Sequence, residues 1–207
     1  MPTPEVLARD ISSWHLDALL QVDTVAWDIE TTGLNWRTER IATCQLHAPG
    51  VGTLIVQLRG EALPVRLCRL LADVRVKKIF HHAPFDLRFM HRWWEVTPSN
   101  VVCTKVASRL LDPFGGGSVH TLRSLLRSFL GVNISKEQRL SDWRAPDLSP
   151  AQLAYAAADV EYLIPLHDEL CSRLASSGLI EIFADCCAFL PAHVQLQVRE
   201  WPDVFAH

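Results

Sequence analysis

Acidic residues inside apolar segments are the feature that most limits how this chain can fold. Asp28 and Glu30 lie in the run VAWDIETTGL, Asp86 lies in HHAPFDL, and Tyr155 and Asp159 lie in YAAADVEYL. Carboxylates are seldom buried without a partner of opposite charge, because removing them from water is costly. We therefore expect the fold to bring these three segments together around a pair of divalent cations.

The spacing of these residues indicates how they converge. The run VDTVAWDI is rich in β-branched and aromatic residues, which favours a strand, and side chains two apart on a strand share a face. Asp28 and Glu30 are thus able to hold one ion. Tyr155 and Asp159 lie four apart in a helical stretch, which places the phenol one turn from the carboxylate. Asp86 follows a proline at a predicted helix start, where the helix end favours an ionised carboxylate.

The pattern along the chain predicts an α/β fold with a mixed sheet flanked by helices. Strand-like runs cover about residues 22–30, 40–48 and 53–58, with turn signals between them, and indicate an antiparallel meander. A helical stretch over about 61–73 leads to a short strand, KKIFHH, and nearly everything after it has a helical pattern. A capping box at 149–152 predicts the start of the helix that carries the tyrosine.

Composition limits the size and the partners of the fold. With 207 residues and 49% hydrophobic content, the chain is long enough for one domain with a substantial core. The formal charge of −3 argues against an extended contact with duplex nucleic acid. No run is long and apolar enough to span a bilayer, and the first ten residues lack a signal-peptide core, so we expect a cytoplasmic protein. The six cysteines have no zinc-site spacing, and we expect them to be reduced.

The chain contains three motifs in order: DxE, an aspartate in the context HxxxxD, and YxxxD. This ordered set resembles that of the RNase D class, the 3′–5′ exonucleases with an Asp-Glu-Asp-Asp core and a tyrosine. The segment ISKEQRLSDW is similar to a Lys-x-x-Gln-x-x-Ser-Asp-Trp element of that class. Within the class, the segments KIFHHAPFDL, VVCTKVASRLL and VNISKEQRLSDW resemble the short nano-RNase C group of bacterial oligoribonucleases. The resemblance implies an RNase H-like, DnaQ-like exonuclease fold. It also implies that residues 1–207 form a single exonuclease domain with no additional C-terminal helical RNA-binding domain.

The resemblance further implies a chemistry. Two Mg²⁺ or Mn²⁺ ions would be bound by Asp28, Glu30, Asp86 and Asp159, and would stabilise the attacking and leaving oxygens of an in-line displacement. Tyr155 would position the attacking water, because a phenol with a pKa near 10 is a poor base. The implied reaction shortens RNA, or DNA, from a free 3′ end and releases 5′-nucleoside monophosphates, with short oligoribonucleotides and dinucleotides as preferred substrates. The implied assembly is a homo-oligomer, with a ring of eight as the candidate.

Candidate substrate contacts follow from the same resemblance: Leu34, His81, Gln138 and Ser141. Leu34 follows the DxE strand and matches a position from which this class wedges an apolar side chain against the terminal bases, although a leucine in a turn is often ordinary packing. Gln138 and Ser141 share a polar segment with Lys136 and Arg139, which either binds phosphate or sugar or is a solvated loop. Trp143 is expected to anchor that segment in the core.

Several alternatives stay open at this stage. His82, where many relatives carry a small polar residue, is either a substrate contact or a turn residue. A broader exonuclease on longer RNA or DNA is the first competing function, with a basic path formed by Arg88, Arg92, Lys105 and Arg109. A non-catalytic interaction module is the second, although the complete set of carboxylates and the tyrosine argues against it. The apolar stretch FADCCAFLPAHVQLQV is either an interface or packs within the molecule.

Overall fold

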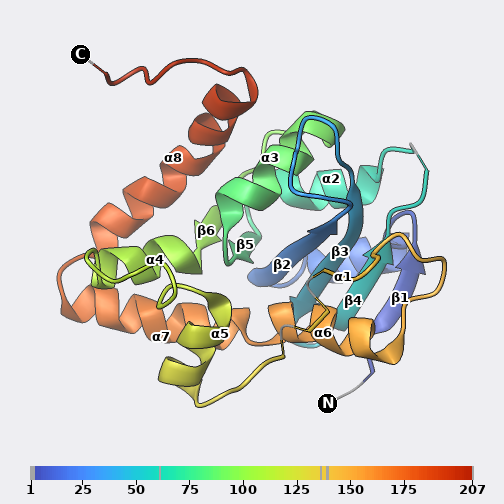
Figure 1. Cartoon of the computed structure of the whole chain (residues 1–207), viewed down its shortest axis with the longest axis horizontal. Helices are drawn as coiled ribbons and strands as arrows, with labels where there is room; N and C mark the ends of the chain where they lie inside the picture. Colours follow the sequence, from blue (N-terminus) through green and yellow to red (C-terminus); the bar gives the residue numbers. More distant parts are fainter. Residues whose placement is uncertain (1–2, 61, 136, 139, 207) are drawn as a thin grey trace.

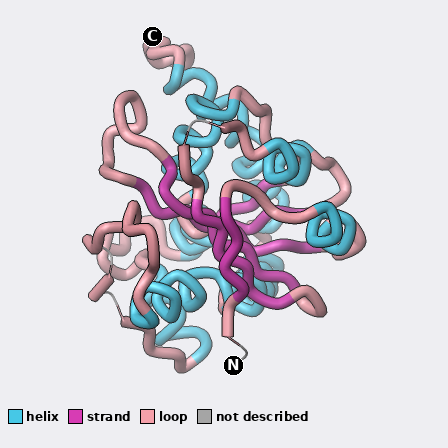
Figure 2. The backbone as a smooth tube through the Cα atoms, turned by 90° about the vertical axis from the view of Figure 1, so that its right-hand side faces the viewer, coloured by secondary structure: helices cyan, strands magenta, loops and turns pink. Residues whose placement is uncertain are grey.

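The computed structural model describes residues 3–60, 62–135, 137–138 and 140–206. A mixed six-stranded sheet forms its centre, with helices on both sides (Figure 1, Figure 2). The strands are β1 (Glu5–Ala8), β2 (Thr24–Thr31), β3 (Ile41–Ala48), β4 (Gly52–Gln57), β5 (Lys77–Phe80) and β6 (Val101–Cys103), in the order β1-β4-β3-β2-β5-β6. The middle strands β2, β3 and β4 pair antiparallel, whereas the pairs β1–β4, β2–β5 and β5–β6 are parallel. The predicted meander and the α/β class are confirmed.

The first three helices lie between strands along the chain, and the other described helices follow β6. The helices are α1 (Ser13–Leu19), α2 (Val65–Ala72), α3 (Ala83–Trp94), α4 (Thr104–Leu111), α5 (Leu122–Leu125), the π-helix η1 (Leu126–Leu130), α6 (Pro150–Glu161), α7 (Leu163–Ser176) and α8 (Ile180–Val198). The stretch expected to be helical from about residue 61 begins only at Val65, because Pro64 occupies the position before the first turn and disfavours helical backbone in the residue ahead of it.

The sequence pattern does not predict β1 and β6, the two edge strands of the sheet. β6 has three residues and β1 has four, which is too short for an alternating pattern to stand out. Both strands pair with a neighbour that is distant in the sequence, and that pairing is tertiary information. The prediction that nearly everything after β5 is helical therefore did not identify the strand at 101–103.

Alternation along β2 decides which face of the sheet carries the acidic residues. Ala26 packs against α6 and α7 through Val160 and Leu163. Its neighbour Trp27 points to the opposite face, is fully buried, and stacks on Phe80 at a centroid distance of 6.0 Å. Residues 28 and 30 follow Ala26 with a period of two, so they share its face and are directed toward α6.

The start of α6 is fixed by the predicted capping box. The Ser149 hydroxyl accepts a hydrogen bond from the Gln152 backbone N–H at 3.2 Å, and the Gln152 side chain accepts one from the Ser149 N–H at 3.0 Å. The amide of Gln152 also donates to the Ser141 hydroxyl and to the Asp142 carbonyl. Caps of this kind contribute about 1 kcal/mol, and this one also ties the preceding segment to the helix.

The C-terminal helix α8 packs against α3, α4 and β6. Its buried face is formed by Phe183, Cys187, Leu190 and Val194. This face of the apolar C-terminal stretch therefore packs within the molecule, which is one of its two predicted alternatives. Phe189, in the same helix, keeps 40% of its surface exposed. All six cysteines are free thiols. Among the described residues, no helix combines the length and the apolar character needed to cross a membrane.

Candidate active site

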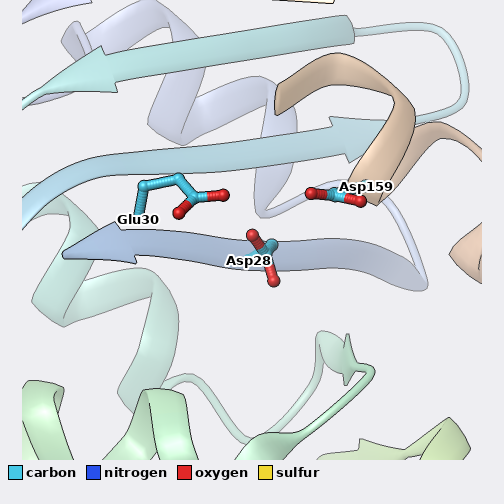
Figure 3. Close-up of side chains that lie close together, drawn as sticks. All are labelled: Asp28, Glu30 and Asp159. Carbon is cyan, nitrogen blue, oxygen red and sulfur yellow. The ribbon is translucent and has the colours of Figure 1, made fainter. Parts of the chain in front are cut away.

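Three carboxylates converge where α6 crosses the face of the sheet. Asp28 and Glu30 project from β2, and Asp159 projects toward them from α6 (Figure 3). Their ligand oxygens all lie within 4.8 Å of one another. The predicted convergence of the DxE pair with the YxxxD helix is therefore present in the fold, and it joins segments about 130 residues apart in the sequence.

A cleft of about 270 Å³ surrounds these carboxylates. Six of the nine predicted site residues line it: Asp28, Glu30, His81, Asp86, Tyr155 and Asp159. Asp86 reaches the cleft from the first turn of α3, as its spacing after proline predicts. The segments β2, α3 and α6 thus supply all of the residues that the sequence singled out for chemistry.

Burial and mutual repulsion control the charge of the site. Burial, followed by the charges of the three neighbouring carboxylates, raises the pKa of Asp28 well above its usual value. Among these neighbours the charge of Asp86 has the largest effect, ahead of Asp159 and Glu30. Asp28 is therefore the central carboxylate of the cluster, and its three acidic neighbours disfavour its ionised form unless a cation lies among them.

The expectation that the helix end keeps Asp86 ionised is wrong for the metal-free site. Asp86 is only 3% exposed, and burial raises its pKa to about 8. The backbone N–H groups of Asp86 and Ile29 and the charge of Arg88 act in the opposite direction, but they do not offset the burial. Sequence spacing located the helix N-terminus correctly and gave no measure of how deeply the carboxylate is buried there.

Tyr155 lies one helical turn before Asp159 and points to the same cleft. Burial, the charges of the carboxylates and a hydrogen bond with the Asp159 side chain raise the pKa of the phenol above its usual value of 10. The ring packs against Trp143 at a centroid distance of 5.8 Å. The phenol is therefore neutral at physiological pH, which suits a positioning role and not proton abstraction.

Histidines and cations form the other wall of the cleft. His81 is held by a hydrogen bond between its Nδ1 and the Thr104 hydroxyl at 3.0 Å, and His82 stacks on Phe85. His82 and Lys105 both line the cleft. The pKa of His82 is lowered to about 4, first by burial and then by three nearby cations, Lys105, Arg88 and Arg109. Three members of the predicted basic path thus gather here, whereas Arg92 packs on Trp93 instead.

Three predicted substrate contacts lie outside the lining of the cleft. Leu34 is 83% exposed in the turn after β2, and its predicted role as a wedge stays a prediction. Ser141 donates a hydrogen bond to the Gln138 carbonyl at 2.7 Å, so the two residues form a local turn. Lys136 and Arg139 lie outside the described residues. Trp143 is 3% exposed, which confirms its predicted role as the anchor of this segment.

Apart from Ile29, which lies between the two acids of the DxE motif, sequence reasoning missed four residues that line the cleft: Phe85, Thr121, Leu122 and Ile134. Phe85 adjoins the Asp86 motif, but its aromatic ring gave no chemical signal of its own. The other three come from the segment between α4 and α6, which has no acidic motif and no strand to place it. Their position in the cleft depends on the path that this segment takes back over the sheet. A short sequence motif carries no information about that path.

The donor set fits divalent cations. The three converging side chains offer only carboxylate oxygens, and the fourth acid lies next to the central one. Mg²⁺ and Mn²⁺ prefer such hard oxygen ligands, whereas zinc sites in proteins usually contain histidine or cysteine. The raised pKa of Asp28 supports the same conclusion, because a cation would remove the repulsion that causes part of that rise.

Comparisons with known proteins place the fold and the motifs in a family. A model of the 3′–5′ exonuclease family matches residues 6–175. Ribonuclease D of Haemophilus influenzae is 33% identical over 194 residues, which cover 88% of this chain and 47% of that protein. The chain therefore belongs to the 3′–5′ exonuclease family, in the group that includes ribonuclease D and NrnC. It spans less than half of the length of the ribonuclease D relatives it matches.

Solved structures agree with this assignment at full length. NrnC of Brucella melitensis is 37% identical and superimposes with a TM-score of 0.90, covering 99% of this chain and 98% of that one. The same protein has been solved with bound Mg²⁺ and bound to pGG. Escherichia coli RNase D, at 22% identity and a TM-score of 0.82, shares the fold over 94% of this chain and 51% of its own. The predicted DnaQ-like exonuclease fold and the predicted resemblance to nano-RNase C are confirmed.

Proposed function

We propose that this protein is a metal-dependent 3′–5′ exoribonuclease that hydrolyses short oligoribonucleotides, dinucleotides above all, to 5′-nucleoside monophosphates. The observation that carries the proposal is the convergence of Asp28, Glu30 and Asp159 beside Tyr155 in one cleft. The proposal assigns residues 1–207 to one exonuclease domain and places the protein in the cytoplasm. It takes two Mg²⁺ or Mn²⁺ ions per site as the cofactors.

The chemistry follows from the position of each side chain. Asp28, Glu30 and Asp159 would hold one cation, and Asp28 with Asp86 would hold its neighbour, since these are the acids that lie together. A bound pair of divalent cations stabilises the attacking and leaving oxygens of an in-line displacement and lowers the pKa of a water. The neutral Tyr155 hydroxyl orients the attacking water, and its hydrogen bond with Asp159 fixes the direction of the phenol.

The preference for very short RNA is supported by two observations. The cleft that contains the acids has a volume of about 270 Å³, slightly below the usual range of ligand pockets, and its size suits the terminal nucleotide of a short substrate. The relative that matches this chain at full length, NrnC, has been solved bound to pGG. His81 is the candidate substrate contact that also lines this cleft, while Leu34, Gln138 and Ser141 remain proposals.

Hydrolysis of 5′-phosphorylated RNA of two to about twenty nucleotides, with Mg²⁺ or Mn²⁺, tests the proposal. We expect the dinucleotide to be cleaved at least about tenfold faster than any longer strand, because the nucleotides beyond the second would extend outside the cleft and make no contacts that stabilise the transition state. Equal stepwise rates on long strands would instead identify a general 3′–5′ exonuclease. Parallel DNA substrates measure whether the 2′-hydroxyl is required.

The broader exonuclease stays as the second candidate function because of one observation. Arg88, Lys105 and Arg109 lie close to His82 at the wall of the cleft, where they would attract a longer phosphate backbone. Binding to a longer strand predicts a steep fall in affinity as salt is raised, because each neutralised phosphate adds to the slope. A flat salt dependence favours the dinucleotide.

Replacing Tyr155 with phenylalanine tests the positioning role. We expect kcat to fall about 100-fold, since the variant keeps the ring against Trp143 and loses only the hydroxyl that orients the water. The stabilisation by Mg²⁺, measured by thermal unfolding, should stay within about 1 °C of the wild type because the carboxylates are unchanged. Undiminished kcat would exclude the hydroxyl from catalysis.

The assembly is a further part of the proposal. The resemblance implies a homo-oligomer, with eight copies as the candidate, and the exposed apolar side chains near the C-terminus are candidate interface residues. These are Ile182, Phe189, Trp201, Val204 and Phe205. Static light scattering measures the mass in solution, and a monomeric mass contradicts this part of the proposal alone.

A further inference from the structure

A second cavity lies beyond the end of β2 and has a volume of about 670 Å³. Its walls come from four segments: the β2–β3 loop, the residues after β4, the C-terminal end of α3 and the segment before α6. None of its described lining residues also lines the acidic cleft. Its volume lies within the usual range of pockets that bind small molecules.

The charge of this second cavity is opposite to that of the cleft. Three arginines line it, Arg40, Arg59 and Arg144, and Glu39 is the one acidic residue among its described lining residues. Glu39 accepts a hydrogen bond from the Thr32 hydroxyl at the edge of the cavity. A net positive lining is notable in a chain whose formal charge is −3, and it selects for an anionic ligand.

The cationic groups are held in place by the surrounding structure. Arg59 donates from Nη2 to the Gln57 side chain at 2.8 Å and to the Pro146 carbonyl, and Gln57 in turn donates to the Ala145 carbonyl at 3.1 Å. These bonds fasten the segment before α6 to the end of β4. Among the described residues, both hydrogen bonds of the Arg59 guanidinium start from Nη2, so Nε and Nη1 remain as donors. Guanidinium groups of this kind recognise phosphate through several donors at once.

Planar groups in the same cavity suit a nucleobase. The Arg40 guanidinium lies over the Trp93 ring, with its central carbon 3.2 Å from the ring centroid. Trp143 lines another wall, on the segment before α6. Bases stack on indole rings and on the planes of arginine side chains, and such stacking accepts any base. A cavity with three guanidinium groups, one of them held flat on an indole, therefore matches the two parts of a nucleotide.

We propose that this cavity is a second binding site, specific for phosphate-bearing nucleotides and separate from the catalytic cleft. Arg59 and Arg144 contact the phosphate, and the exposed plane of the Arg40 guanidinium, supported from behind by Trp93, stacks on the base. Two sources have this chemistry: a free 5′-mononucleotide, or the distal part of an RNA strand. Trp143 lies between the two sites, since it lines the cavity and packs on Tyr155 of the cleft. Whether the ligand is a mononucleotide or an RNA strand rests on the proposed function, but the binding of a nucleotide to this cavity does not.

Titration in EDTA tests this proposal without relying on hydrolysis. Removing divalent cations weakens phosphate binding at the acidic cleft, and the variants then show whether the binding that persists depends on the arginines of the second cavity. The two probes are 5′-AMP, followed by calorimetry, and a labelled 5′-phosphorylated hexaribonucleotide, followed by fluorescence anisotropy. The test variant is Arg40→Gln with Arg144→Gln. The matched control is Arg127→Gln with Arg173→Gln, which removes the same charge from two exposed arginines outside the cavity.

We expect the test variant to bind at least one probe at least tenfold more weakly than the wild type, while the control variant binds within twofold. Weaker binding of 5′-AMP identifies the mononucleotide as the ligand, and weaker binding of the hexanucleotide alone identifies the RNA strand. The proposal is overturned if neither probe binds the wild type, or if the test variant binds both probes as tightly as the wild type does. The cavity would then belong to another occupant, such as an acidic protein segment. Thermal unfolding of both variants verifies that they are folded. Failure of the wild type to hydrolyse RNA would contradict the proposed function and leave these results intact.

Discussion

Replacing Asp28 with asparagine is expected to lower kcat/KM for RNA hydrolysis at least about 1,000-fold, because this carboxylate lies at the centre of the proposed metal cluster. Asparagine preserves the shape of the side chain and removes its charge. The fold should survive, and the metal-free variant should unfold at a higher temperature than the wild type. The reason is that burial and three neighbouring carboxylates disfavour the ionised form of Asp28, and the amide has no charge to desolvate.

Hydrolysis assays and thermal unfolding, each with and without Mg²⁺, measure these effects. Asp112→Asn is the matched control, since it removes an exposed acid from outside the cleft. The control should keep both the activity and the Mg²⁺-dependent rise in unfolding temperature, whereas Asp28→Asn should lose both. Activity of the Asp28 variant within tenfold of the wild type would remove this residue from the catalytic centre.

The stability of the metal-free protein is expected to fall as the pH rises from about 4 to about 8. Burial raises the pKa of Asp86 to about 8 from the usual value of 3.8. In this window the folded state retains a proton that the unfolded state has released, so unfolding releases protons and higher pH favours it. The effect is complete above about pH 8, where both states are ionised. We expect a decrease in unfolding temperature of at least about 3 °C, which corresponds to about 1 kcal/mol for a chain of this size.

Mg²⁺ should reverse this trend, because ions bind the ionised carboxylates and compete with protons for them. The rise in unfolding temperature caused by saturating Mg²⁺ should therefore be larger at pH 8 than at pH 5. Asp86→Asn should reduce the pH dependence of the metal-free protein, since it removes one of the two buried carboxyls, with Asp28, whose raised pKa retains a proton. Unfolding temperatures that are independent of pH in both the wild type and the variant would contradict the raised pKa.

The helices and strands that carry the candidate catalytic residues could be predicted from the sequence, because the signals for them lie within short segments. The alternation around Asp28 and the capping box before Tyr155 are each contained within about ten residues, and both are confirmed. The resemblance to the exonucleases rests on the same short motifs. Sequence spacing also placed Asp86 in the first turn of its helix, because proline sets that boundary.

What could not be predicted depends on contacts between distant segments. The edge strands β1 and β6 are too short to carry a pattern and exist through pairing with β4 and β5. The charge of Asp86 depends on how completely the fold buries it, which its neighbours in the sequence do not reveal. Three of the four residues of the predicted basic path gather around His82, but nothing in the sequence separates them from Arg92, which packs on Trp93. The larger cavity draws its walls from four separate segments.

The alternation of β2 has a consequence for how the length of this chain can vary. Insertion or deletion of one residue between Thr24 and Asp28 would exchange the two faces of the strand, moving the carboxylates into the space of Trp27 and an apolar side chain into the cleft. No adjustment of side chains repairs such an exchange. Homologous chains should therefore differ in length after β2, in the loop over 32–40, and keep a constant number of residues within the strand.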